Sequence, residues 1–125
     1  MIKATIGEQH YLTTIYARNH VLTADEPLLN GGGDRGVAPQ ELLAASLASC
    51  TCITLRMYSE RKKWDAGIIE VNVDIEKESS SVRFDRKILL TGILNEEQKA
   101  KLLDIANHCP VHKILSGVVS INTSI

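Results

Sequence analysis

The N-terminal part of the chain alternates apolar and polar residues with the period of a strand. Residues 9 to 17 place Tyr11, Thr13, Ile15 and Ala17 on one face, Arg18 and Asn19 indicate a turn, and residues 20 to 24 resume an extended segment. This pattern predicts an N-terminal meander. The segment that follows, residues 25 to 38, is rich in glycine, which predicts a mobile loop.

Two further regions alternate in the same way. Residues 68 to 77 carry Ile69, Val71, Val73 and Ile75 on one side and polar residues on the other, which is typical of a half-solvated antiparallel strand. A return strand over residues 82 to 91 completes a predicted hairpin. The alternation at residues 119 to 125 predicts a last strand near the end of the chain.

Residues 39 to 63 predict one long helix. Pro39 suits the first helical position, and Glu41 suits the positive end of the helix dipole. The first half of this segment is apolar or small on every face, so we expect it to be buried all round.

Two shorter helices are predicted near the C-terminus. Asn95 and Gln98 form a capping-box pair at the start of the first, and its inner face is predicted from four apolar residues: Ala100, Leu102, Leu103 and Ala106. The second begins at Pro110 and ends near Ser116.

Composition narrows the class of protein. The chain has 125 residues and is 44% hydrophobic, which predicts a single globular domain over residues 1–125. Its net charge of -1 argues against nucleic acid or an anionic membrane as the main partner, so we expect a small-molecule substrate. We find neither a leader segment nor an apolar stretch of membrane-helix length, and therefore expect a cytoplasmic protein.

Three cysteines carry the candidate chemistry. In a cytosolic chain they are expected to be reduced and either catalytic or inert. Cys50 and Cys52 lie about 200° apart around the long helix, so only one of them can enter a given site, and we interpret Cys52 as a packing residue. Cys109 precedes Pro110 and is the predicted N-cap of a helix, where backbone N–H groups stabilise a thiolate and lower the thiol pKa. His112 follows on the same side, where it can hydrogen-bond the sulfur or, when protonated, attract it.

Two other motifs suggest a zinc site and a dinucleotide-binding site, but the residues fit each of these sites poorly. His108, Cys109, His112 and Cys50 are donor types that zinc accepts, but the chain has no Cys-x-x-Cys pair, so we predict no metal site. The tract Gly31-x-Gly33-x-x-Gly36 matches a dinucleotide-binding fingerprint in form. Asp34 within it would repel a pyrophosphate, and no parallel βαβ unit surrounds it.

Three segments together resemble the OsmC/Ohr family of osmotically induced and organic hydroperoxide resistance proteins. They are the run from Gly32 to Cys50 with its Pro-x-Glu-Leu-Leu start, the run from Thr54 to Tyr58, and Cys109-Pro-Val-His112. The resemblance implies an α+β fold with antiparallel sheets around a long central helix. It also implies an intertwined homodimer with thiol sites at the interface and no cofactor.

The resemblance further implies thiol-dependent reduction of organic hydroperoxides, such as alkyl or fatty-acid hydroperoxides. In that mechanism Cys50 attacks the peroxide and becomes a sulfenic acid, Cys109 resolves it into a disulfide, and an external dithiol reduces the disulfide.

In the family an arginine activates the first cysteine, and a glutamate ten residues before that cysteine holds the arginine. Here Gln40 occupies the glutamate position and Glu41 lies one step further round the helix. The candidate arginines are Arg35, in the glycine-rich loop, and Arg18, at the first turn. Arg35 is favoured because a loop could close over Cys50.

The departure at Gln40 leaves two alternative hypotheses open. One is a non-catalytic dimeric stress-response module that binds a small apolar or thiol-containing ligand at the same interface. The other is a purely structural stress protein, in which the thiols only fill space.

Overall fold

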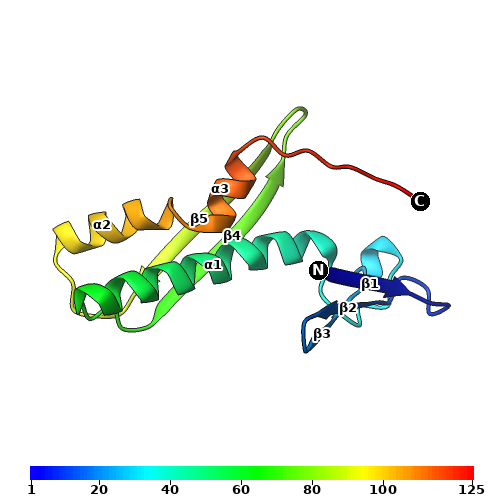
Figure 1. Cartoon of the computed structure of the whole chain (residues 1–125), viewed down its shortest axis with the longest axis horizontal. Coiled ribbons are helices and arrows are strands. Elements are labelled where there is room, and N and C mark those ends of the chain that lie inside the picture. The colour runs from blue at the N-terminus through cyan, green and yellow to red at the C-terminus, as the bar shows by residue number, and fades with distance from the viewer. The chain divides into compact units, whose positions relative to one another are not determined.

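The computed structural model describes all 125 residues, which divide into two compact units, residues 1–43 and 44–125. Figure 1 shows the chain coloured from its N-terminus to its C-terminus. The elements in chain order are β1 (Ile2–Ile6), β2 (Thr13–Ala17), β3 (His20–Ala24), the short 3-10 helix η1 (Leu28–Asn30), α1 (Pro39–Lys62), β4 (Ile69–Lys77), β5 (Val82–Leu90), α2 (Glu96–Ala106) and α3 (Pro110–Ser116). The α+β class with two antiparallel sheets and one long helix is confirmed.

The first unit contains a three-stranded antiparallel sheet in the order β1-β2-β3. The predicted meander is therefore confirmed for β2 and β3, whereas β1 was not predicted. Arg18 lies in the two-residue turn between β2 and β3 with a φ of 56°. A positive φ at this position suits the right-handed twist of the flanking strands.

The loop after β3 is irregular, as predicted, and packs closely on its own strand. Asp25 donates its N–H to the carbonyl of Val37, next to an isolated parallel bridge between Ala24 and Val37. A side chain at Gly32 would collide with the backbone of Glu26. The glycines thus allow close backbone approach, and no phosphate-binding role is needed to explain them.

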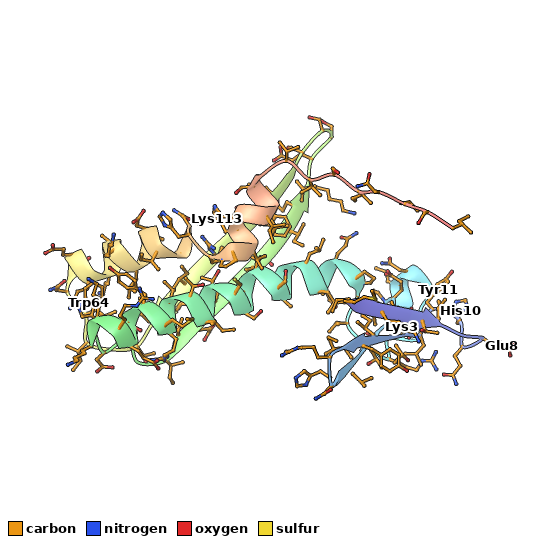
Figure 2. All side chains as sticks on the ribbon, viewed as in Figure 1. Lys3, Glu8, His10, Tyr11, Trp64 and Lys113 are labelled. Carbon is orange, nitrogen blue, oxygen red and sulfur yellow. The ribbon has the colours of Figure 1, made fainter.

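The second unit contains the β4–β5 hairpin at the predicted position. Its register pairs Ile69 with Leu90 and Val71 with Ile88, so these apolar side chains share one face. Ile69, Ile88 and Leu90 border a core cluster formed by Leu55 of α1 with two α2 residues, Leu102 and Ala106. Trp64, labelled in Figure 2, packs against this cluster and meets Tyr58 edge to face with ring centroids 5.6 Å apart.

Helix α1 is present as predicted, but the prediction that its first half is buried on every side is wrong. Its buried residues recur at every fourth position and form one stripe: Leu47, Thr51, Leu55 and Ser59. Leu43, in the first half of the helix, is 48% exposed, and Ile53 and Met57 further along are 59% and 58% exposed. The reason is that the hairpin and α2 pack on only one side of this helix.

Helix α2 begins with the predicted capping box between Asn95 and Gln98. Its predicted inner face is only half right, because Leu102 and Ala106 are buried whereas Leu103 is 62% exposed and Ala100 is also exposed. Residues one position apart on a helix point about 100° apart, so Leu102 and Leu103 cannot both face the same core.

The predicted last strand is absent. Residues 118–125 form no regular structure, and Val119 and Ile121 are 61% and 85% exposed. Alternation supplies an apolar face, but a strand also needs a neighbouring strand for its backbone hydrogen bonds. Neither sheet of this chain pairs with the segment.

The expectation that no segment has membrane-helix character also needs correction. By length and composition alone, α1 is apolar enough to cross a membrane. This is weak support for a membrane span, because the core helix of a soluble protein passes the same test.

Neighbouring leucines on α2 provide a direct test of the core. Leu102 is 1% exposed, so Leu102→Ala should lower the free energy of unfolding by about 2–5 kcal/mol. Leu103→Ala removes the same atoms from an exposed position and should cost about 0.5 kcal/mol or less. Chemical denaturation of both variants measures this difference. Equal losses would contradict the packing described here.

Candidate functional site

Cys109 is the N-cap of α3, as the sequence predicts. Its sulfur accepts a hydrogen bond from the backbone N–H of His112 at 3.3 Å, and Pro110 occupies the first turn. Cys109 is 0% exposed. The sulfur therefore fills the place that a serine or aspartate oxygen takes at most helix starts, while it remains shielded from water.

Two neighbouring residues of α1 bring further groups to this sulfur. The hydroxyl of Thr51 lies 3.9 Å from Cys109 Sγ and also donates to the carbonyl of Leu47 at 2.7 Å. The side chain of Cys50, which is only partly buried, is close enough to act as a hydrogen-bonding group that lowers the pKa of Cys109. The structure thus brings together, within one chain, the two cysteines singled out from the sequence.

Arg86 of β5 completes the polar surroundings. Its Nη1 donates to Thr51 Oγ1 at 3.0 Å and to the carbonyl of Ala106 at 3.1 Å, and its Nη2 donates to Asn107 Oδ1 at 3.0 Å. All three acceptors are neutral. Arg86 takes part in no ion pair, so its positive charge is not compensated by a carboxylate.

These contacts set the acidity of Cys109. Burial raises the pKa of the thiol, because it disfavours the charged form. Hydrogen bonds from the His112 N–H, the Cys50 and Thr51 side chains and the Val111 N–H act in the opposite direction and outweigh burial. The pKa of Cys109 therefore lies below its ordinary value, as the sequence predicted from the helix start.

His112 hydrogen-bonds the Cys109 sulfur, but through its backbone N–H and not through its side chain. Burial lowers the pKa of its imidazole, and the positive charge of Arg86 and the nearby His108 lower it further. These effects favour the neutral imidazole over an imidazolium that would attract the sulfur. Its contribution is the backbone N–H at the start of α3.

A cavity of about 480 Å³ opens beside this cluster. Its polar part is lined by five residues: Arg83, Arg86, Asn107, His112 and Ser116. Its apolar walls come from α1, β5, α2 and α3: Leu47, Val82, Phe84, Ile88, Leu103 and Leu115. An apolar cavity with a few convergent polar groups is typical of a small-molecule site.

Cys52 lies apart from this cluster. Its thiol is partly buried and donates to the carbonyl of Ile69 at 3.7 Å, toward the hairpin. This position agrees with a packing role. The structure contains no group of three or more histidine, cysteine, aspartate or glutamate side chains able to hold a metal ion.

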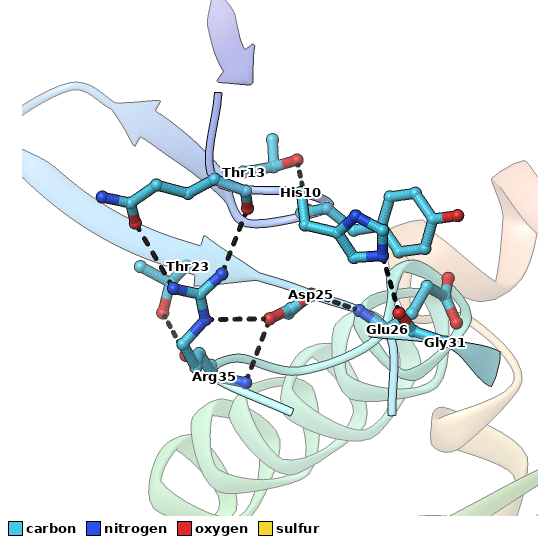
Figure 3. Close-up of polar contacts among 9 residues, drawn as sticks. His10, Thr13, Thr23, Asp25, Glu26, Gly31 and Arg35 are labelled. Carbon is cyan, nitrogen blue, oxygen red and sulfur yellow. Dashed lines mark hydrogen bonds and ion pairs between the residues drawn. The ribbon is translucent and has the colours of Figure 1, made fainter. Parts of the chain in front are cut away.

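Arg35 and Arg18 both belong to the first unit. Figure 3 shows the Arg35 guanidinium facing Asp25. The guanidinium donates to Asp25 at 3.4 Å and to the side chain and backbone carbonyl of Gln9 at 3.3 and 3.1 Å. The Asp25 side chain is 0% exposed. The buried Asp25 carboxylate therefore holds Arg35 in place, and no carboxylate at position 40 is needed for this. These hydrogen bonds also hold the loop more firmly than its glycine content suggests.

The start of α1 explains the neighbouring polar residues. Glu41 accepts a hydrogen bond from the backbone N–H of Ala38 at 2.8 Å, which caps the helix. Gln40 is exposed. Glu41 thus has a structural role at the helix start, whereas the proposed roles of Gln40, Arg35 and Arg18 toward Cys50 stay predictions.

Sequence reasoning missed Arg86 and Thr51. A signal for Arg86 exists in the strand pattern, because positions 82, 84, 86, 88 and 90 share one face and four of them are apolar. An arginine on the inner row of a hairpin has to find polar partners there. Thr51 gave no such signal, because a helical threonine commonly bonds its own backbone.

Comparison with known proteins adds the family. The sequence model of the OsmC-like protein family matches residues 31–124, which is more than half of the chain. The chain belongs to the OsmC family. None of the curated proteins matches it.

Solved structures of OsmC-like proteins share the fold. An OsmC-like protein from Mycoplasma pneumoniae has a TM-score of 0.81 at 20% identity, with 94% of this chain and 87% of that chain covered. The organic hydroperoxide resistance protein OsmC of Legionella pneumophila has 0.68 at 20%, covering 94% and 88%. The organic hydroperoxide resistance protein OhrB of Bacillus subtilis has 0.64 at 22%, covering 94% and 90%.

The acidity of Cys109 can be measured directly. In a Cys50→Ser/Cys52→Ser variant, which keeps a hydrogen-bond donor at position 50, ultraviolet thiolate absorbance should titrate below the ordinary value of about 8.5. The same variant unfolded in guanidinium should titrate at that ordinary value. The thiolate then contributes stability that is fully present above the unfolded pKa and is lost as the pH falls through the folded pKa. Identical titrations in the two states would show that the helix start does not stabilise the thiolate.

Proposed function

We propose that this OsmC-family protein reduces organic hydroperoxides with the Cys50–Cys109 thiol pair. The observation that carries the proposal is that the side chain of the partly buried Cys50 is among the hydrogen-bonding groups that lower the pKa of Cys109 at the start of α3. Two neighbouring thiols, one of them with a lowered pKa, are suited to two-electron redox chemistry.

The proposed reaction starts at Cys50. Its thiolate attacks the terminal peroxide oxygen, the O–O bond breaks, and the alcohol leaves after it gains a proton. Cys50 is then a sulfenic acid. The Cys109 thiolate attacks the Cys50 sulfur, a disulfide forms and water leaves, and an external dithiol returns both sulfurs to the reduced state.

The cavity beside Cys109 supports a substrate with an apolar group. At about 480 Å³ it has the size of a small-molecule pocket, and most of its wall residues are aliphatic or aromatic. An alkyl or fatty-acid hydroperoxide fits this chemistry better than hydrogen peroxide, because burial of an alkyl chain adds about 0.8 kcal/mol for each CH₂ group.

Activation of Cys50 is proposed to involve Arg35 or Arg18. The buried Asp25 carboxylate supports Arg35, since it supplies the negative partner that Gln40 cannot. Replacement of each arginine by alanine identifies the partner, because only that variant should slow the first oxidation of Cys50. Equal rates in both variants would remove these two arginines from the mechanism.

We also propose that the protein works as a homodimer. Large apolar side chains of the first sheet are exposed, including Ile2 at 66% and Val21 at 62%, as are Ile53 on α1 and Ile121 in the C-terminal segment. Exposed apolar surface on this scale is typical of an interface. Sedimentation of the purified protein should give twice the mass of one chain, and a monomer at micromolar concentration would contradict the proposal.

Three single variants test the thiol roles. Cys50→Ser should abolish consumption of cumene hydroperoxide, because it removes the thiol that attacks the peroxide, and the Cys109 thiol that remains is 0% exposed. Cys109→Ser should allow one fast oxidation to a sulfenic acid but no disulfide, so turnover with a dithiol should fall by about a hundredfold or more. Cys52→Ser is the matched control and should keep the wild-type rate. Peroxide consumption and intact-protein mass provide the readouts.

The opposite pattern would favour the non-catalytic alternative. In that case the three thiols would oxidise slowly and without preference, and Cys50→Ser would consume peroxide as fast as the unmodified chain. The cavity would then serve to bind a small apolar or thiol-containing ligand.

A further inference from the structure

The two sulfurs of the proposed disulfide differ in their surroundings. Cys109 is 0% exposed, whereas Cys50 is only partly buried. Reduction of a disulfide needs a thiolate to attack one sulfur while the other leaves as a thiolate. The exposed fractions therefore favour Cys50 as the sulfur that an external thiol attacks.

The leaving sulfur would also find a prepared environment. The N–H of His112 lies 3.3 Å from Cys109 Sγ at the start of α3, and the Thr51 hydroxyl lies 3.9 Å from it. These donors favour the negative sulfur over the neutral thiol, and a thiol that ionises more easily leaves faster. The exposure of Cys50 and the donors around Cys109 therefore both favour attack on Cys50 with Cys109 as the leaving sulfur.

Arg86 strengthens the Thr51 contact without touching sulfur. Its Nη1 occupies one lone pair of Thr51 Oγ1 at 3.0 Å, so the single hydroxyl proton is left to the Leu47 carbonyl or to Cys109. When negative charge develops on the sulfur, the proton can turn toward it. The guanidinium polarises this hydroxyl and has no carboxylate partner that would cancel its charge.

We propose that a reducing thiol attacks the Cys50 sulfur of the disulfide and that Cys109 leaves as a thiolate positioned by Thr51 and Arg86. The inference rests on the proposed function, which forms the disulfide. A bond forms between the external sulfur and Cys50 while the Cys50–Cys109 bond breaks, with its electron pair on Cys109. The second thiolate of the dithiol then attacks its own bound sulfur and releases Cys50, so two electrons are transferred and the dithiol becomes a cyclic disulfide.

The direction of attack can be determined by trapping. The protein is oxidised with diamide rather than with a peroxide, treated briefly with glutathione, quenched in acid, and then denatured and alkylated with N-ethylmaleimide. Peptide mass spectrometry should find glutathione on Cys50 and maleimide on Cys109. Glutathione mainly on Cys109 would overturn the inference.

The use of diamide separates this inference from the proposed function. If diamide forms the disulfide but cumene hydroperoxide does not, the peroxidase proposal fails while the trapping result still decides the direction of reduction. A diamide-treated protein that forms no Cys50–Cys109 disulfide at all would overturn the inference, because its substrate would not exist.

Variants of Thr51 and Arg86 test the positioning role. Thr51→Val keeps the shape and removes the hydroxyl, so reduction by dithiothreitol should slow about fivefold or more, and Thr51→Ser should restore the rate. Arg86→Met should also slow the reduction of the disulfide by dithiothreitol. Lys87→Met, at the neighbouring exposed position of β5, is the matched control and should leave the rate unchanged.

A pH titration distinguishes positioning from loss of structure. The groups around Cys109 that titrate or carry charge are Cys50 on α1, Arg86 on β5, His112 on α3 and His108 just before it. In Thr51→Val and Arg86→Met, the thiolate titration of Cys109 should move to higher pH in parallel with the slower reduction. Slower reduction with an unmoved titration would overturn the role of both residues.

Discussion

The contact between the Cys109 sulfur and the start of α3 organises the second unit. The sulfur caps the helix through the His112 N–H, and the Thr51 hydroxyl approaches it from α1. Arg86 ties Thr51 to β5 and to the end of α2 through Ala106. One buried thiol thus connects three helices and the hairpin, and the same contacts that hold the fold lower the pKa of that thiol.

The partly buried guanidinium of Arg86 has a desolvation cost that the neighbouring groups offset. An arginine on the inner row of a hairpin loses water, and it is tolerated here because three neutral acceptors satisfy it. Its uncompensated charge also makes the imidazole of His112 harder to protonate. The site therefore lowers the pKa of both the Cys109 thiol and the His112 imidazole, the first through hydrogen bonds and the second through burial and nearby positive charge.

Much of this arrangement could be predicted from local sequence signals. Cys109 before Pro110, the capping box at Asn95 and the alternation of β4 each depend on a few adjacent residues, and all three were predicted correctly. The errors concern features that depend on distant partners. Whether one face of α1 is covered, and whether residues 118–125 pair as a strand, depends on surfaces that the local pattern does not encode. The contact of Arg86 with Thr51 spans 35 positions and belongs to the same class.

Peptide mapping of the reduced protein after one equivalent of cumene hydroperoxide tests the central claim most directly. If the two sulfurs act as one redox unit, the chain should lose two hydrogen atoms within seconds, and the peptides of Cys50 and Cys109 should be joined under non-reducing conditions. Oxidation spread over all three cysteines, without that link, would contradict the account.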